Sequence, residues 1–376
     1  MEKKTENRFS RKEKILTGTL VSLTIVMLLT TLIGLIYFKQ QIAGSNLKDE
    51  EQYNEYERQY VLITKDIDDT FWDSVYEEMK EAGDETGVYV ERLGRNLSME
   101  YSKNDLMEIA IDSHVDGIIL EADESDETAA LINKADAEGI PVVTIMRDAM
   151  GTTRKSFVGI SNYNLGSEYG KLIVNASKEL QERSAPEGND TDQGQTLLPD
   201  PEAEADPVQV LILIDKNSTD TSQNIIYTAI QEELEKEGFD KSKAQVDTAA
   251  ISNDGAFSAE ESIRDIFQNS EYQPDVIVCL NELNTKSIYQ TVVDQNKVGQ
   301  IMIIGYYDSE TILRAVQRKV IYATITVNTK QMGSYCVKAL NEYIDTGHVS
   351  DYFSVDFTLI DKDNVNEYLR SLDDNE

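Results

Sequence analysis

The chain has 376 residues, which is enough for two lobes and an additional segment. Its 69 acidic and 35 basic residues give a formal net charge of −34, and this balance excludes a nucleic-acid groove, because phosphate contacts require basic side chains. The cysteines, Cys279 and Cys336, lie in apolar and helical patterns that predict buried thiols. Two scattered histidines predict no metal cluster, and we expect no cofactor.

The N-terminal region has the pattern of a membrane anchor. Residues 1–14 are basic, and residues 15–38 contain no charge and are long enough, at about 1.5 Å per residue, to cross a hydrocarbon core of about 30 Å. Positive-inside bias then predicts a cytoplasmic tail over 1–14, a transmembrane helix over 15–38 and a polar stalk over 39–58. The chain would be a single-pass protein of the cell membrane with an extracytoplasmic C-terminal domain.

A cleaved signal peptide is the alternative for this region. The segment Ile42-Ala43-Gly44-Ser45 offers a small-residue cleavage site. The apolar run is well beyond the roughly 7–15 residues that are usual in such a peptide, so a retained anchor is favoured.

After the stalk, short apolar runs rich in β-formers alternate with amphipathic stretches, which predicts βαβ units and mostly parallel sheets. The first half contains predicted strands at 60–64, 88–91, 116–120, 141–145 and 157–160. The second half repeats the alternation, with strands at 208–214, 244–248, 275–280, 301–305 and 322–326. The predicted fold class is α/β, with two doubly wound parallel-sheet lobes of similar size.

Residues 184–206 interrupt the second lobe with a segment rich in proline, glycine and acidic residues. This composition buries too little apolar surface to order a chain, so we expect a disordered acidic insertion. The segment follows a helix and precedes a strand, whereas ligands of open α/β sheets bind beyond the carboxyl ends of the strands. It should therefore point away from the ligand, and both a tolerated loop and a docking segment for a partner stay open.

Aromatic and polar residues follow the predicted strands of the first half. Asp69, Phe71 and Trp72 come after the first strand, at the start of a helix. Aromatic faces stack on the C–H faces of pyranose rings, and carboxylates accept hydrogen bonds from neighbouring hydroxyls. Arg147 follows the strand over 141–145 with a planar fork of donors. A structural alternative is that an aspartate caps this helix and Phe71 belongs to the core.

The second half has polar residues at the same topological positions. Asn281 and Glu282 follow one strand, Tyr307 and Asp308 the next, and Asn328 the last. Asparagine and aspartate also favour caps and turns, so each position alone is a weak signal. Because the pattern recurs after successive strands, we expect ligand contacts from Asp69, Phe71, Trp72, Arg147, Asn281, Glu282, Tyr307, Asp308 and Asn328.

Over residues 59–367 the chain resembles the periplasmic-binding-protein type I family, particularly the ribose-binding and related sugar-binding proteins, which share their fold with LacI-type repressors. The motifs that carry the resemblance are Asp69-Thr70-Phe71-Trp72, Asp116-Gly117-Ile118-Ile119-Leu120, Gly139-Ile140-Pro141-Val142-Val143-Thr144, Val158-Gly159-Ile160-Ser161-Asn162, Pro274-Asp275 with Asn281-Glu282, Ile304-Gly305-Tyr306, and Ala323-Thr324-Ile325 with Met332-Gly333.

The resemblance implies two lobes joined by three crossover strands near 160–161, 327–328 and 355–357. It implies an N-lobe of 59–160 with 328–355 and a C-lobe of 161–327 with 356–376. By matched position it implies ligand contacts from Asp69, Phe71, Trp72, Arg147 and Asn281.

The chain departs from the family pattern at several binding positions. Met146 replaces an aspartate, Tyr307 replaces another with Asp308 beside it, and Val327 stands for a glutamine with Asn328 adjacent. An arginine that usually opens a C-lobe helix has no counterpart in 219–224. These changes leave the identity of the ligand open. The apolar N-terminal segment, in place of a DNA-binding helix pair, excludes a repressor.

The expected function is extracytoplasmic binding of a small ligand, expected to be a sugar, in an interlobe cleft that closes by a hinge. The first interpretation is a receptor for an ABC-type importer and its permease. The alternative is an accessory protein that senses the ligand for a membrane histidine kinase or chemoreceptor. An enzyme is disfavoured, because pairs such as Asp68-Asp69 are expected from composition and no nucleophile motif is present.

Overall fold

The computed structural model describes residues 23, 27, 29–31, 56–65, 70–97, 99, 101–184, 207–216, 221–252, 255–268 and 273–373. The chain divides into two compact units, Met1–Tyr56 and Glu57–Glu376. Of the first unit, residues 23, 27 and 29–31 are described as helical. Most of the predicted tail, membrane helix and stalk lies outside the described residues, as do positions 185–206 of the predicted insertion. Among the residues that are described, no helix has the length and apolarity needed to span a membrane.

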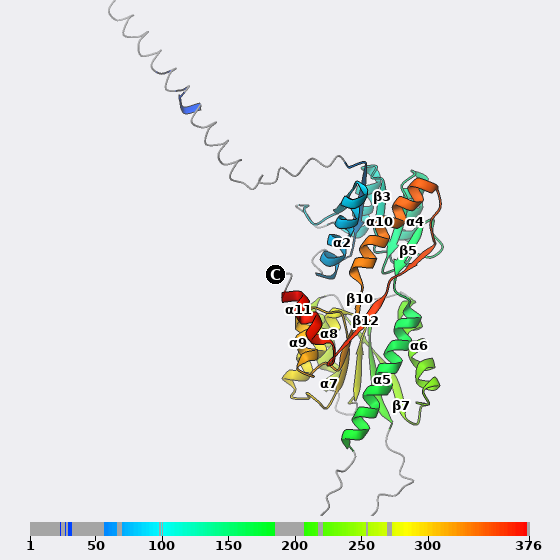
Figure 1. The fold of residues 1–376 in the computed structure, drawn as a ribbon, viewed down its shortest axis with the longest axis vertical. Helices are drawn as coiled ribbons and strands as arrows, with labels where there is room; N and C mark the ends of the chain where they lie inside the picture. The colour runs from blue at the N-terminus through cyan, green and yellow to red at the C-terminus, as the bar shows by residue number, and fades with distance from the viewer. Residues whose placement is uncertain are drawn as a thin grey trace, which may run out of the picture. The chain divides into compact units, whose positions relative to one another are not determined.

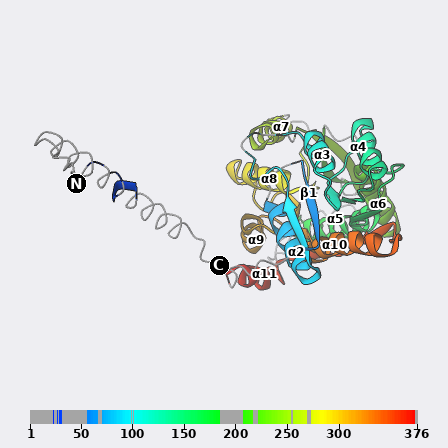
Figure 2. The ribbon, with the colours of Figure 1, turned by 90° about the horizontal axis from the view of Figure 1, so that it is seen from above.

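The N-lobe is built on a six-stranded sheet in the order β11-β5-β4-β3-β1-β2, and all of its pairings are parallel. Its strands are β1 (Arg58–Ile63), β2 (Val88–Arg92), β3 (Gly117–Leu120), β4 (Val142–Ile145), β5 (Ser156–Gly159) and β11 (Tyr352–Ser354). Its helices are α2 (Thr70–Thr86), α3 (Lys103–Asp112), α4 (Asp126–Ala137) and α10 (Thr329–Thr346). Helices α2 and α10 cover one face of this sheet, and α3 and α4 cover the other (Figure 2).

The C-lobe has a second six-stranded sheet, in the order β12-β10-β9-β8-β6-β7. Its two edge strands, β12 and β7, are labelled in Figure 1. Its strands are β6 (Val208–Asp215), β7 (Ala244–Ile251), β8 (Val276–Cys279), β9 (Met302–Tyr306), β10 (Ala323–Val327) and β12 (Phe357–Asp361). Its helices are α5 (Asn162–Ser184), α6 (Ser222–Lys236), α7 (Ala256–Gln268), α8 (Glu282–Asp294), α9 (Glu310–Gln317) and α11 (Val365–Asp373). Strand β12 runs antiparallel to β10, and the other pairings of this sheet are parallel.

The prediction of two α/β lobes with mainly parallel sheets is confirmed. The chain passes between the sheets three times: from β5 to α5, from β10 to α10, and from β11 to β12. The central strands β3, β4 and β8 are buried along their whole length, because helices cover both faces of each sheet. Both cysteines are fully buried free thiols, as predicted, and burial raises the pKa of Cys279 to about 12.

Helices α2 and α10 pack closely at Gly333. A Cβ atom added to this glycine would lie 2.8 Å from the Val75 carbonyl oxygen and 2.8 Å from the Met79 backbone nitrogen, so a side chain there must push the helices apart. We expect Gly333→Ala to lower the free energy of unfolding by about 1–3 kcal/mol, as overpacking does. Denaturant titration measures this loss, and Lys330→Ala, at an exposed site of the same helix, should stay within about 0.5 kcal/mol of the parent. Equal stability of the two variants would contradict the close packing.

Candidate ligand-binding site

A cavity of about 240 Å³ lies between the two lobes, at the carboxyl ends of their strands. Its N-lobe wall consists of Phe71, Trp72, Glu121, Met146, Arg147 and Ile160. Its C-lobe wall consists of Asn162, Leu165, Asp215, Ser222, Gln223, Ile226, Leu280, Asn281, Glu282, Tyr306 and Tyr307. This position agrees with the general rule that open α/β sheets bind ligands beyond the ends of their strands.

The structure brings six of the nine expected contact residues to this cavity: Phe71, Trp72, Arg147, Asn281, Glu282 and Tyr307. Asp69 lies outside the described residues. Asp308 and Asn328 are described but do not line the cavity.

Asp308 and Asn328 make contacts within the protein and not with the cavity. Asn328 is the N-cap of α10, where its Oδ1 accepts a hydrogen bond of 3.0 Å from the Gln331 backbone N–H. This is the capping role that asparagine commonly takes. The Asp308 carboxyl is partly buried beside Thr326, and desolvation raises its pKa above the usual value.

Aromatic rings from both lobes meet at the cavity. The ring centroids of Phe71 and Trp72 lie 5.1 Å apart in an edge-to-face arrangement. Phe71 also contacts Tyr307 of the C-lobe edge-to-face, with 5.5 Å between centroids. Trp72 is only 4% exposed. These rings give the cavity an apolar wall that both lobes supply, which suits the C–H face of a small ring.

Two non-glycine residues with positive φ stand at equivalent places in the two lobes. Met146 (φ 60°) directly follows β4, and Tyr307 (φ 80°) directly follows β9. Each of these strands is the fourth in its sheet, counted from the edge strand β2 in the N-lobe and from the edge strand β7 in the C-lobe. The Arg147 N–H donates to the Ile145 carbonyl at 2.6 Å and closes a tight turn about Met146. Such conformations cost about 1–3 kcal/mol and gather at functional sites. The sequence carries no signal for them, because neither residue is glycine or asparagine.

Most charged groups of the cavity are engaged with protein partners. The Glu121 carboxylate accepts from the Lys65 N–H at 2.8 Å and lies 3.9 Å from Arg147 Nε. Glu282 pairs with Lys286 at 2.5 Å. The carboxylates of Glu121 and Glu282 thus have protein partners, and Arg147 is the cationic side chain of the described cavity wall.

Two amide side chains use their oxygens within the C-lobe. Asn281 Oδ1 caps α8 by accepting from the Asn284 N–H at 2.7 Å, and Gln223 Oε1 accepts from the Asp215 N–H at 3.0 Å. Among the described residues, Asn281 Nδ2 and Gln223 Nε2 make no hydrogen bond, so both nitrogens can donate to a ligand. Sequence reasoning missed Gln223, Asp215 and Glu121 as candidates. Glu121 and Asp215 could have been found by the rule used for the others, since each stands at the end of a strand.

A polar contact joins the lobes at the edge of the cavity. Glu124, in the loop after β3, accepts hydrogen bonds from the backbone N–H and the hydroxyl of Thr221, both at 3.3 Å. Thr221 is the N-cap of α6 and makes no side-chain cap within its own helix. The Glu124 carboxylate thus caps this helix from the opposite lobe, a favourable place for negative charge.

We expect Glu124→Gln to speed ligand dissociation by up to about fivefold, because the contact exists only when the lobes meet and an exposed charged contact is worth up to about 1 kcal/mol. Stopped-flow measurement of the dissociation rate checks this. Glu127→Gln, on the exposed first turn of α4, is the matched control and should leave the rate unchanged. Equal rates in both variants would show that the contact does not hold the lobes together.

Among the described residues, no three histidine, cysteine, aspartate or glutamate side chains are grouped as metal ligands would be. The cavity wall thus offers aromatic faces, one guanidinium, amides and carboxylates that are paired within the protein. This set can hold a small polar ring by stacking and hydrogen bonding without covalent chemistry.

Comparison with known proteins gives a family for this fold. Residues 60–348 match the family model described as a periplasmic binding protein domain. No curated protein matches the chain. Among solved structures, a glucose-galactose binding protein from Geobacillus stearothermophilus, GanP, is similar at 20% identity, with 82% of this chain and 98% of that chain covered and a TM-score of 0.66.

Two further structures show the same fold. The sugar-binding protein of a sugar ABC transporter from Bacillus halodurans has 19% identity, covering 83% of this chain and 100% of that chain, with a TM-score of 0.64. The XylFII-LytSN complex has 21% identity, covering 81% and 98%, with a TM-score of 0.60. The family match spans most of the chain, and the two-lobed fold agrees with it, so the chain belongs to the periplasmic binding protein family, type I fold.

Proposed function

We propose that this protein is an extracytoplasmic solute-binding protein that holds a monosaccharide in the interlobe cavity. The observation that carries the proposal is the contact of Phe71 with both Trp72 and, across the cavity, Tyr307, in a cavity that Arg147 also lines. A cavity volume of about 240 Å³ lies just below the range of about 300–1,000 Å³ that is typical of ligand pockets. A single sugar ring suits this space.

Binding would act through closure of the lobes. A sugar stacked on the N-lobe rings and bonded to Asn281 of the C-lobe interacts better with the closed arrangement than with an open one. It therefore shifts the equilibrium toward closure by that difference in affinity. The three chain passages between the sheets would serve as the hinge, with an N-lobe of 59–160 and 328–355 and a C-lobe of 161–327 and 356–376.

A thermal stabilisation screen of the intact protein tests the proposal. We expect D-glucose, D-galactose or L-arabinose to raise the melting temperature, since a ligand that binds only the native state stabilises it by mass action. Amino acids of similar size are the matched control and should have no effect. Stabilisation by an amino acid and by none of the sugars would overturn the proposed ligand class.

We also propose that the protein is anchored in the cell membrane by a helix over 15–38, with the tail 1–14 inside and the stalk 39–58 outside. The uncharged run of 24 residues supports this, since 38 − 15 + 1 = 24. Externally added protease should release the domain from intact cells. Release of the domain without protease would favour a cleaved signal peptide instead.

For the downstream partner, an ABC-type importer is the first candidate, supported by the neighbour described as the sugar-binding protein of an ABC transporter. A membrane histidine kinase or chemoreceptor, for which the protein would sense the ligand, is the second candidate; the structurally similar XylFII is known in a complex with LytSN. Deleting the gene separates the two candidates. Loss of radiolabelled sugar uptake points to import, whereas normal uptake with loss of sugar-induced transcription points to sensing.

We propose that the predicted insertion over 184–206, whose first residue, Ser184, ends α5, is remote from the cavity. Asp215, at the carboxyl end of β6, lines the cavity, and Val208, at the other end, is about 23 Å away for a strand rising about 3.3 Å per residue. We expect deletion of 185–206 to leave sugar affinity within twofold of the parent by calorimetric titration. A large loss would mean that this segment reaches the binding site.

A further inference from the structure

The loop 146–155 carries Met146 and Arg147 into the cavity without the support of a helix. It joins β4 to β5, which are parallel neighbours paired at Ile145 and Val158. Parallel neighbours are usually joined by a dozen or more residues that form a helix. This loop has ten residues, since 155 − 146 + 1 = 10, and contains no helix. Backbone hydrogen bonds from Met146 to Val158 and from Lys155 to Val142 hold its two ends, and side-chain contacts add to them between these ends.

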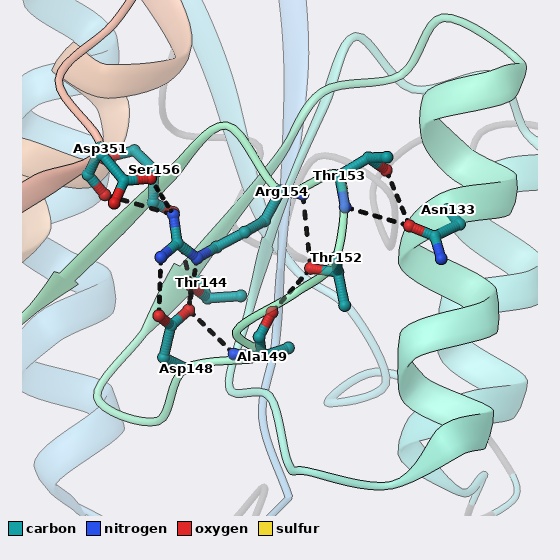
Figure 3. Close-up of polar contacts among 9 residues, drawn as sticks. All are labelled: Asn133, Thr144, Asp148, Ala149, Thr152, Thr153, Arg154, Ser156 and Asp351. Atoms are coloured by element: carbon teal, nitrogen blue, oxygen red, sulfur yellow. Dashed lines mark hydrogen bonds and ion pairs between the residues drawn. The ribbon is translucent and has the colours of Figure 1, made fainter.

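One arginine makes the main contacts of this loop (Figure 3). Arg154 donates from Nε to Asp148 Oδ1 at 2.5 Å and from a terminal nitrogen to Asp148 Oδ2 at 2.7 Å. Its other terminal nitrogen donates to Asp351 Oδ1 at 2.7 Å. The Arg154 side chain is only 10% exposed. A planar guanidinium is suited to holding two carboxylates at once in a fixed geometry.

Asp148 fixes the loop next to the cavity. Its carboxylate also accepts from the Thr144 hydroxyl of β4 at 2.7 Å and from the Ala149 N–H at 2.8 Å. Asp148 is the neighbour of Arg147, which follows the tight turn about Met146. The Arg154–Asp148 pair thus holds the backbone that directs the Arg147 side chain to the cavity.

Asp351 lies at the start of the last chain passage between the lobes. It directly precedes β11, and its carbonyl accepts from the Phe157 N–H of β5 at 2.9 Å. After β11 the Val355 N–H bonds to the Gly159 carbonyl at 2.8 Å, and the chain then enters β12 of the C-lobe. Asp351 thus links Arg154 to the strand that leads into this passage.

We propose that Arg154 is a positioning residue that couples the cavity segment Met146–Arg147 to β11, the N-lobe edge strand that leads into the last passage between the lobes. Its role in binding rests on the proposed function, because Arg147 is taken as a ligand contact. Arg154 itself does not line the cavity. By binding both Asp148 and Asp351, Arg154 fixes the position of the Arg147 backbone relative to the last passage between the lobes.

Hydrogen–deuterium exchange on the intact, sugar-free protein tests the coupling independently of any ligand. We expect Arg154→Gln to raise exchange at least tenfold in peptides covering both 146–151 and 351–355. Asp351→Ala should raise exchange over 351–355 alone, because the Asp148 pair remains. Arg314→Gln, which breaks only an exposed pair with Glu310, is the matched control and should change neither segment. Unchanged protection of 351–355 in Arg154→Gln overturns the coupling, and so does a uniform rise across the whole lobe.

A double-mutant cycle tests the effect on binding. Calorimetric titration with D-glucose, D-galactose and L-arabinose should show that Arg154→Gln weakens affinity at least tenfold in the parent protein. In an Arg147→Ala background the same change should cost less than twofold, because Arg154 acts through Arg147. Equal losses in both backgrounds overturn the positioning role. Arg154→Lys should not restore affinity, since an ammonium cannot form the fork. If the parent binds none of these sugars, the proposed function fails, and the exchange experiment still decides the coupling.

Discussion

Replacing Trp72 by alanine is expected to weaken sugar binding by roughly 30- to 1,000-fold, the range of about 2–4 kcal/mol that buried aromatic anchors contribute. Trp72 lines the cavity, and its partner Phe71 reaches across to Tyr307 of the other lobe. Removing the indole leaves the apolar wall without its largest ring. Calorimetric titration of the intact protein with the sugar panel measures the loss.

Loss of stability could mimic this effect, because truncating a buried tryptophan costs about 3–5 kcal/mol of folding free energy. Met79→Ala is the matched control. Met79 lies on the same helix, is fully buried and does not line the cavity. It should lower the melting temperature and leave the affinity of the remaining folded protein unchanged. Similar affinities for the two variants would show that Trp72 is only a core residue, as its burial would also allow.

Arg147→Ala is expected to weaken binding by roughly 10- to 150-fold, or about 1.5–3 kcal/mol, the value of hydrogen bonds to a charged group. The side chain is 36% exposed, and its nearest carboxylate, Glu121, is 3.9 Å away, so little packing is lost with it. The melting temperature of the sugar-free protein should therefore stay nearly constant. Calorimetry with the sugar panel gives the affinity.

Arg147→Lys separates charge from geometry. A lysine keeps the positive charge but has no planar fork, so we expect it to recover only part of the lost affinity. Arg314→Ala, on the exposed face of α9, is the control and should bind like the parent. Parent-like affinity in Arg147→Ala would remove this residue from the site.

The central strands could be predicted from sequence because they are buried on both faces. Strands such as β3 and β8 form continuous apolar runs bounded by polar residues. The antiparallel β12 and the three-residue β11 were absent from the strand prediction made by pattern. Their exposed and partly exposed positions give neither a continuous run nor a clear alternation. They were expected only as a crossover implied by resemblance.

Part of the cavity wall could be predicted, because residues such as Arg147 and Asn281 directly follow strands in the sequence. That rule cannot tell a ligand contact from a cap, and Asn328 is a cap. The positive φ of Met146 and Tyr307 could not be predicted, because these residue types rarely adopt it. Nor could the Arg154–Asp351 pair, whose members are 197 residues apart in sequence.

Fluorescence of Trp72 offers the most direct test that both lobes share one sugar. It is the sole tryptophan of the chain and lines the cavity, so its emission reports on this site alone. Titrating the intact protein with D-glucose, D-galactose and L-arabinose should give a saturable change with at least one of them. Arg147→Ala in the N-lobe and Asn281→Asp in the C-lobe should each shift that titration to much higher concentration. Calorimetric binding of a sugar with constant Trp72 emission, or parent-like titration of both variants, would contradict a shared interlobe site.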